Sequence, residues 1–161
     1  TVNSKEEMIA MVQACKYPPL GNRSNAGIRG EWGKITDYRH YMDKVNEELL
    51  IIPMIETQKA LDNIEDILSV QGIDVLLVGP SDLSIELGVP VNYSSEIFQQ
   101  ALDKIVDACK KCSIVPGMYF IPPYGGYVEE VFSPEMDYAY YIDKGFRFFT
   151  VPWTQWLMNH D

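Results

Sequence analysis

The sequence predicts an α/β fold in which repeated βα units build a parallel sheet. Short apolar runs with β-branched members alternate along the chain with amphipathic helical patterns. This alternation is typical of sheets whose strands are buried on both faces. Two architectures share it, the doubly wound sheet and the (β/α)8 barrel. Four strands are predicted, and since a complete barrel takes about 250 residues, the barrel interpretation requires that about half of it lies elsewhere.

Composition predicts one soluble globular domain over residues 1–161, without a nucleic-acid or membrane partner. The net charge is −10, and the thirteen Lys and Arg residues are scattered rather than clustered as phosphate contacts require. The chain contains no apolar run of about 18 to 20 residues and no signal-peptide pattern. We therefore expect a cytoplasmic protein. Because the first residue is Thr1 rather than Met and the last predicted helix is cut at Asp161, we expect a domain that is truncated at both ends.

The first elements are predicted to be two helices. Ser4 and Glu7 form a capping box, and apolar residues then recur at helical spacing up to Tyr17, where two prolines follow. A Gly- and Arg-containing loop is expected over residues 20–32. A second helix is expected around residues 37–46.

Two strand–helix units come next. Residues 49–55 form an apolar run that predicts a strand buried on both faces. Thr57 caps the following helix, and Gly72 ends it. Residues 73–78 predict the second strand, which a Gly-Pro-Ser-Asp turn at residues 79–82 closes. The buried face of the helix after Thr57 consists of Ala60, Leu61, Ile64, Ile67 and Leu68.

The last predicted units repeat this order. Residues 114–120 predict the third strand, followed by a Pro-, Gly- and Tyr-rich loop over residues 121–132. Ser133-Pro134 opens a helix that ends at Gly145, and residues 146–151 predict the fourth strand. A final helix begins near Trp153. The helix before the third strand has an apolar face at 3.6-residue spacing, formed by Ile97, Phe98, Ala101, Leu102, Ile105, Val106 and Cys109.

An acidic residue follows each of two neighbouring predicted strands, Glu56 and Asp82. In both parallel architectures ligands bind outside the carboxyl ends of the strands, and neighbouring strands lie about 4.8 Å apart. Two carboxylates so close share either a proton or a cation. Mg²⁺ or Mn²⁺ takes oxygen ligands and commonly uses one or two carboxylates. The alternative is that Glu56 caps the next helix and Asp82 closes a turn.

Four motifs resemble, in order, those of the HpcH/HpaI class II aldolase family. The segments Pro53–Thr57 and Gly79–Ser84 look like the paired metal motifs of that family. Lys16–Arg23 looks like its YPPxGxR loop, and Tyr41 with Asn46 matches its helical pattern of Tyr and Asn separated by four residues. Together these motifs cover nearly the whole chain, so the resemblance is more specific than any single motif.

The resemblance implies a TIM barrel of the phosphoenolpyruvate/pyruvate type, of which this chain is the C-terminal half with about the last four βα units. It also implies a metal-dependent carbon–carbon lyase, an aldolase that acts on 2-oxo acids through a pyruvate enolate, with oxaloacetate decarboxylation as a related activity. Glu56 and Asp82 fall on the family's metal ligands, for Mg²⁺, Mn²⁺ or Co²⁺. The backbone N–H groups of Ser81 and Asp82 fall where the substrate carboxylate is held. The implied partners are a 2-oxo acid, an aldehyde and further copies of the chain in a trimer or hexamer.

The chain departs from the family pattern in two respects. Met54 stands where many bacterial members have a substrate-contacting Gln, and its side chain cannot make that hydrogen bond. The family's catalytic His and Arg are expected upstream of Thr1, so no catalytic residue is assigned in this chain. We interpret His40 and His160 as surface or interface residues. Arg23 either orients a loop or a subunit contact or is a solvated side chain.

Other interpretations are weaker. A half-barrel that keeps only a metal site or a subunit interface, without catalysis, is the main alternative. A phosphate-binding barrel or a Rossmann-type nucleotide site is not indicated, because no glycine-rich fingerprint such as GxGxxG is present and Gly125-Gly126 stands alone. Cys109 and Cys112 have the spacing of zinc and thiol redox sites, but no second Cys pair or nearby His completes such a site.

Overall fold

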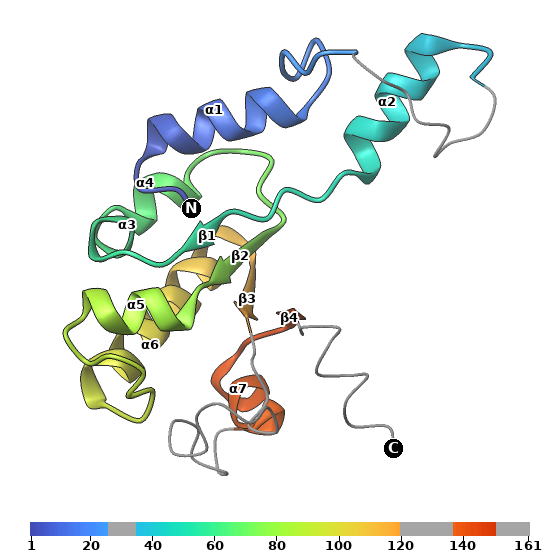
Figure 1. Ribbon diagram of the computed structural model, residues 1–161. Helices are drawn as coiled ribbons and strands as arrows, with labels where there is room; N and C mark the ends of the chain where they lie inside the picture. Colours follow the sequence, from blue (N-terminus) through green and yellow to red (C-terminus); the bar gives the residue numbers. More distant parts are fainter. Residues whose placement is uncertain (26–34, 120–136, 151–161) are drawn as a thin grey trace, which may run out of the picture.

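The computed structural model describes residues 1–25, 35–119 and 137–150 and contains one four-stranded parallel sheet (Figure 1). The strands follow chain order and are β1 (Met54–Ile55), β2 (Val75–Val78), β3 (Val115–Tyr119) and β4 (Phe148–Thr150). The helices are α1 (Lys5–Cys15), α2 (Tyr38–Glu48), α3 (Gln58–Asp62), α4 (Ile64–Leu68), α5 (Pro80–Glu86), α6 (Glu96–Cys112) and α7 (Tyr138–Lys144). The predicted α/β fold with a parallel sheet is confirmed.

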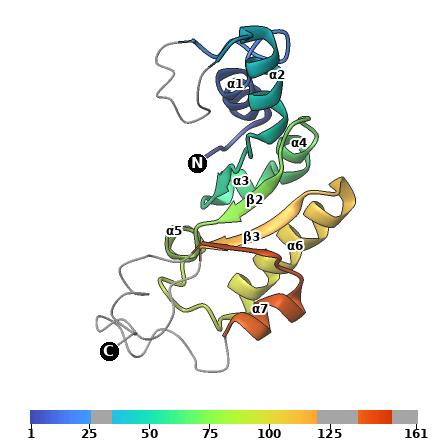
Figure 2. The same cartoon turned by 90° about the vertical axis from the view of Figure 1, so that its right-hand side faces the viewer.

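The arrangement of the sheet favours the barrel over the doubly wound alternative. The strand order β1-β2-β3-β4 shows no reversal, whereas a doubly wound sheet reverses its order at a switch point and carries helices on both faces. Figure 2 shows α4 and α6 on the same side of the sheet. Helices on one side leave the other face of the strands directed inward, as in a barrel.

The face of the sheet toward the helices carries the main core. Ile55, Val78 and Met118 lie in register on β1, β2 and β3, and all three are buried in one apolar cluster with the inner face of α6. Phe98 and Leu102 of α6 are fully buried in that cluster. This packing fixes the strands relative to one another. It therefore also fixes the positions of the residues that follow their carboxyl ends.

The opposite face of the sheet carries the side chains that lie next to the carboxyl ends of the strands. Met54, Leu77, Gly117 and Phe148 lie side by side in register on the four strands. A Cβ on Gly117 would lie 2.8 Å from Val75 Cγ1, so a larger residue would push the strands' side chains apart. Because side chains alternate along a strand, the residues two positions beyond this row point to the same side.

The N-terminal helix begins as predicted. Ser4 is the N-cap of α1, and its hydroxyl accepts from the Glu7 N–H at 3.3 Å. The Glu7 carboxylate accepts from the Asn3 N–H at 2.7 Å rather than from that of Ser4, so the capping box is shifted by one residue. The helix ends at Cys15, two residues before the predicted end at Tyr17.

The first strand is shorter than predicted. Of residues 49–55 only Met54 and Ile55 pair in the ladder, because Pro53 has no N–H to donate. The expectation of burial on both faces is also wrong there, since Leu50 is 58% exposed whereas Ile51 is 1% exposed. On the outer side of β1, the Val2 N–H donates to the Met54 carbonyl at 3.1 Å.

The segment after Thr57 forms two short helices instead of the single one predicted. Thr57 caps α3 as expected, accepting from the Ala60 N–H at 3.1 Å, but the helix breaks at Asn63. The Asn63 side chain donates to the Asn3 carbonyl at 3.0 Å. Helix α4 ends at Leu68, before Gly72. The five apolar residues predicted for the inner face are all buried.

Two further predictions need correction. Gly79-Pro80-Ser81-Asp82 does not form a closing turn: β2 leads directly into α5, with Pro80 in its first turn, where a missing N–H costs nothing. Ile97 of α6 is 46% exposed, whereas the other six residues of its predicted face are buried.

Several predictions lie outside the described residues. These are the loop over 121–132, the helix start at Ser133-Pro134, the helix near Trp153, and His160. Helix α7 begins at Tyr138, with Asp137 as its N-cap, and ends at Gly145 as predicted. Among the described helices none has the length and apolar character needed to cross a bilayer.

The loop after α1 and helix α2 form one unit. The Tyr17 N–H donates to Asn46 Oδ1 at 2.7 Å, and Asn46 Nδ2 donates to the Tyr17 carbonyl at 3.0 Å. The Arg23 guanidinium lies 4.8 Å from the centre of the Tyr17 ring. Arg23 thus contacts Tyr17 within this loop, and its role stays a prediction.

Replacing Asn46 is expected to destabilise the protein. Asn46→Ala removes both hydrogen bonds and leaves the Tyr17 N–H buried without an acceptor, which costs about 1 to 3 kcal/mol in the free energy of unfolding. The Tyr17 carbonyl keeps the Leu20 and Gly21 N–H groups as donors. Urea denaturation measures this value. The control Asn22→Ala alters an exposed residue of the same loop and is expected to stay within about 0.5 kcal/mol of the parent. Equal stability of the two variants would contradict the structural role of Asn46.

Candidate functional site

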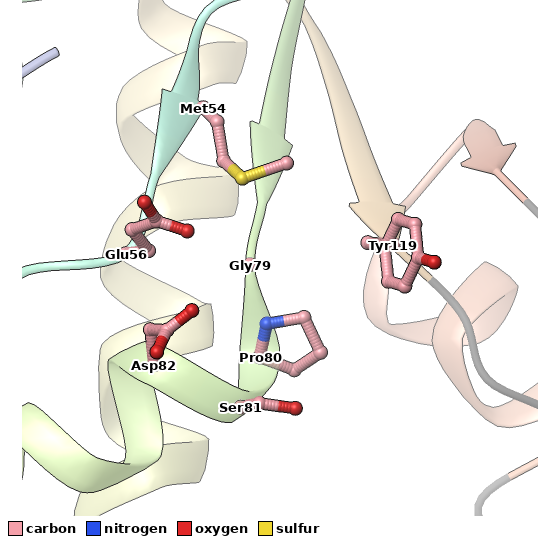
Figure 3. A pocket seen from close by; sticks show the side chains of 7 residues that line it. All are labelled: Met54, Glu56, Gly79, Pro80, Ser81, Asp82 and Tyr119. Atoms are coloured by element: carbon pink, nitrogen blue, oxygen red, sulfur yellow. The ribbon is translucent and has the colours of Figure 1, made fainter. Parts of the chain in front are cut away.

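A cavity of about 180 Å³ lies at the carboxyl ends of β1, β2 and β3 (Figure 3). It is lined by Met54, Glu56, Gly79, Pro80, Ser81, Asp82 and Tyr119. Six of these residues come from the two segments 53–57 and 79–84 that the sequence analysis singled out. The cavity occupies the end of the sheet where parallel-sheet proteins bind ligands.

The structure brings Glu56 and Asp82 to one cavity from two different elements. Glu56 follows β1 directly and is half-buried, and Asp82 stands exposed in the first turn of α5. In Figure 3 their carboxylates point into the same space beside Gly79. The alternative in which Glu56 caps the next helix is wrong, because Thr57 is the N-cap of α3.

Gly79 allows the Glu56 carboxylate to take this position. A Cβ at residue 79 would lie 2.7 Å from Glu56 Oε2, 3.1 Å from Glu56 Cβ and 3.1 Å from Met54 Sδ. The Gly79 backbone has φ −91° and ψ 93°, which any residue can adopt. Glycine is therefore required here for the close approach of a side chain and not for its own conformational freedom.

The Glu56 carboxylate also has a hydrogen-bond donor on its other side. The Thr1 hydroxyl donates to Glu56 Oε1. Thr1 is held there because Val2 lies beside β1 and because Asn3 contacts the Thr57 hydroxyl through its side-chain oxygen. One carboxylate oxygen is thus fixed by Thr1 and the other lies over Gly79.

The first turn of α5 supplies amide donors at the cavity. The first helical hydrogen bond of α5 runs from the Leu83 N–H to the Gly79 carbonyl at 3.1 Å. The N–H groups of Ser81 and Asp82 precede it, and first-turn amides have no helical acceptor. Their position in a helix explains why two amides and one carboxylate from consecutive residues border the same cavity.

Two tyrosines near the site were missed in the sequence analysis. Tyr119 ends β3 and lines the cavity, so the strand-end rule that selected Glu56 and Asp82 could also have selected it. Tyr93 is buried, and its hydroxyl oxygen lies 3.1 Å from Ser81 Oγ. Burial raises the pKa of Tyr93, the hydrogen bond with Ser81 opposes that rise, and the Asp82 charge adds to it. No sequence signal marks Tyr93.

The other candidates from the sequence do not line the cavity. His40 is exposed on α2 and Arg23 lies on the loop that α2 holds. Cys109 is fully buried, and burial foremost, with a contribution from Cys112, raises the pKa of its thiol to about 12. Cys112 is exposed. A thiol with so high a pKa is neither a ready metal ligand nor a nucleophile at neutral pH.

The donor set of the cavity fits a hard divalent cation. In the described part of the chain no group of three or more His, Cys, Asp and Glu side chains converges, so a closed zinc-type site is not formed by these residues. Two carboxylates suit Mg²⁺ or Mn²⁺, which commonly bind through one or two carboxylates and complete their shells with water or substrate oxygens.

Known proteins are similar to most of this chain. Residues 1–121 match the model of the HpcH/HpaI aldolase/citrate lyase family. The 2-keto-3-deoxy-L-rhamnonate aldolase of Escherichia coli strain K12 is 32% identical over 125 residues, which are 76% of this chain and 46% of the relative. A 4-hydroxy-4-methyl-2-oxoglutarate aldolase of Chaetomium globosum is 36% identical over 119 residues, which are 73% of this chain and 44% of the relative. The chain thus spans about half the length of these relatives.

A solved structure extends the similarity beyond the matched sequence. The crystal structure of an HpcH/HpaI aldolase from Desulfitobacterium hafniense DCB-2 superposes with a TM-score of 0.79 at 26% identity. The superposition covers 98% of this chain and 57% of that one. The similarity therefore includes the part of the chain beyond residue 121, which the family match leaves out.

Proposed function

Because the chain belongs to the HpcH/HpaI aldolase/citrate lyase family, we propose that it forms part of a metal-dependent carbon–carbon lyase that acts on 2-oxo acids. The observation that carries the proposal is the convergence of Glu56 and Asp82 on one cavity at the carboxyl ends of the strands. Both aldolases that the chain resembles are named for 2-oxo acid substrates, which supports a pyruvate-type reaction.

Glu56 and Asp82 are the residues that would hold the cation. Mg²⁺ and Mn²⁺ fit the two carboxylates, with Co²⁺ as a third candidate, and the ion would supply Lewis-acid polarisation of the 2-oxo group. Thr1 and Gly79 act on the same carboxylate: the first donates to it, and the second leaves space for it. The Glu56 side chain is thereby held toward the cavity before any ligand enters.

The other lining residues would bind the organic part of the substrate. The N–H groups of Ser81 and Asp82 are suited to the carboxylate of a 2-oxo acid, since amide donors stabilise an anion. Met54 presents a thioether, which has no proton to donate, so we place it against an apolar part of the substrate. This contact would disfavour an aldehyde whose hydroxyl groups need a partner at that position.

Proton transfer would need a further group. Among the described residues that line the cavity none is a histidine, and His40 is exposed on α2. We propose that the base which takes the proton of the substrate hydroxyl belongs to the full-length protein outside this lining. Without it the 161-residue chain alone would lose the factor of about 10² to 10⁴ that general base catalysis contributes. Oxaloacetate decarboxylation, a homo-oligomeric state and a cytoplasmic location remain predictions.

Metal dependence tests the proposed function. The full-length gene product would be assayed for release of pyruvate from a 4-hydroxy-2-oxo acid, before and after dialysis against EDTA. We expect activity to disappear on dialysis and to return with Mn²⁺ or Mg²⁺. Turnover that is indifferent to EDTA would contradict the proposal and would indicate a Lys Schiff base instead. Binding of Mn²⁺ with no lyase activity on any 2-oxo acid would identify the non-catalytic alternative.

A further inference from the structure

We propose that Tyr93 is a positioning residue that fixes the Ser81 hydroxyl so that it donates to the carboxylate of a bound 2-oxo acid. The inference rests on the proposed function and deepens it, because it adds a side chain outside the cavity lining to the substrate site. Tyr93 lies in the connection between α5 and α6, which neither strand-end reasoning nor the family motifs mark.

Tyr93 is held rigidly under the site. Its side chain is 2% exposed, and its ring packs on that of Phe98 with centroids 5.2 Å apart. Its main-chain carbonyl accepts from Gln99 Nε2 at 2.7 Å. Because both the ring and the backbone are anchored to α6, the hydroxyl oxygen has a defined place, 3.1 Å from Ser81 Oγ.

Ser81 is fixed by two contacts from opposite ends of the residue. Its carbonyl accepts from Ser84 Oγ at 2.7 Å, and Ser84 Oγ also accepts from the Val91 N–H at 2.9 Å. Ser84 is fully buried. The segment that carries Tyr93 is therefore tied to α5 through Ser84 as well as through the Ser81 hydroxyl.

Either hydroxyl group can be the donor in this contact, and the proposal takes Tyr93 as the donor. Burial raises the pKa of Tyr93, so its phenol keeps its proton at neutral pH and can donate it to Ser81. A serine hydroxyl that accepts from Tyr93 still has its own proton to donate. Ser81 lines the cavity, so that proton is available to an oxygen of an anionic ligand.

The test is the affinity of the Mn²⁺-loaded full-length protein for pyruvate, measured by calorimetry, together with KM and kcat for cleavage. Tyr93→Phe keeps the ring against Phe98 and removes only the hydroxyl. We expect pyruvate to bind about 5- to 10-fold more weakly, the usual worth of one hydrogen bond, and KM to rise by a similar factor while kcat changes less than about 2-fold. Tyr41→Phe is the control, since it makes the same change at a buried tyrosine of α2 and should leave pyruvate affinity unchanged.

A double-mutant cycle separates positioning from a general loss of structure. If Tyr93 acts through Ser81, adding Tyr93→Phe to Ser81→Ala should weaken pyruvate binding no further than Ser81→Ala alone. The proposal would be overturned if the two substitutions together weakened pyruvate binding by the product of their separate factors. It would also be overturned if Tyr93→Phe bound pyruvate as tightly as the parent. Melting temperatures of all variants identify any that misfold. If Tyr93→Phe does, Ser81→Ala serves as the second variant, because it removes the other hydroxyl of the same contact, and parent-like pyruvate affinity in Ser81→Ala would overturn the proposal.

Failure of the proposed function has a different signature. If the parent protein binds no Mn²⁺, or binds pyruvate without it, the proposed function is wrong and the inference on Tyr93 falls with it. If the parent protein binds Mn²⁺ and, in its presence, pyruvate, the proposed function stands. If Tyr93→Phe then binds pyruvate as tightly as the parent does, the inference on Tyr93 alone is refuted.

Discussion

Glu56→Gln is expected to lower turnover of the full-length enzyme by about 10³-fold, since a bound cation contributes several kcal/mol of charge stabilisation. The substitution keeps the shape of the side chain and removes the negative charge that a hard cation requires. Glu56 is half-buried and faces the cavity. We therefore expect no other carboxylate to take over its role as a ligand in the variant. We expect Mn²⁺ binding, followed by calorimetry, to weaken in parallel with turnover. Asp82→Asn should act in the same direction.

The control for this prediction is Glu65→Gln. Glu65 lies exposed on α4, where its carboxylate is 3.2 Å from Lys111 Nζ, and an exposed pair of this kind contributes little. We expect its turnover, Mn²⁺ affinity and melting temperature to match those of the parent. Retention of full turnover by Glu56→Gln would show that the carboxylate pair is not the metal site, whatever the family resemblance implies.

Gly79→Ala is expected to impair the metal site while the fold survives. The added Cβ would meet Glu56 Oε2 at 2.7 Å and Met54 Sδ at 3.1 Å, and both atoms belong to side chains that can turn away. It would also lie 3.1 Å from Glu56 Cβ, which a small shift of the neighbouring backbone relieves. The backbone at residue 79 tolerates alanine, so the melting temperature should change little. Displacing the Glu56 carboxylate should weaken Mn²⁺ binding by about 10- to 100-fold, the range found when the support of a metal ligand is altered.

Gly88→Ala provides the matched control, since it is expected to lower stability without changing the metal site. Gly88 has φ +75°, and a Cβ there would meet nothing within 4 Å. Alanine at this position is strained by its backbone alone and should cost about 1 kcal/mol of stability without changing Mn²⁺ affinity. If Gly79→Ala bound Mn²⁺ as tightly as the parent, the placement of Glu56 over Gly79 would not matter for the site.

The sequence by itself determined which segments fold into elements and which strand ends carry acids. Ser4, Thr57 and the apolar spacing of α6 each act locally, through a cap or a helical period, and local signals of this kind can be recognised without the fold. Parallel strands bring their carboxyl ends to one edge of a sheet, so Glu56 and Asp82 could be paired from their order in the chain alone.

Only the tertiary structure decided how the site is supported. The contact of Tyr93 with Ser81, the donation from Thr1 to Glu56 and the close approach of Glu56 to Gly79 join residues whose side chains meet only after the strands and helices have packed. Sequence periodicity describes one element at a time, whereas these features depend on the distance between elements, which is set by how the buried side chains fill the core.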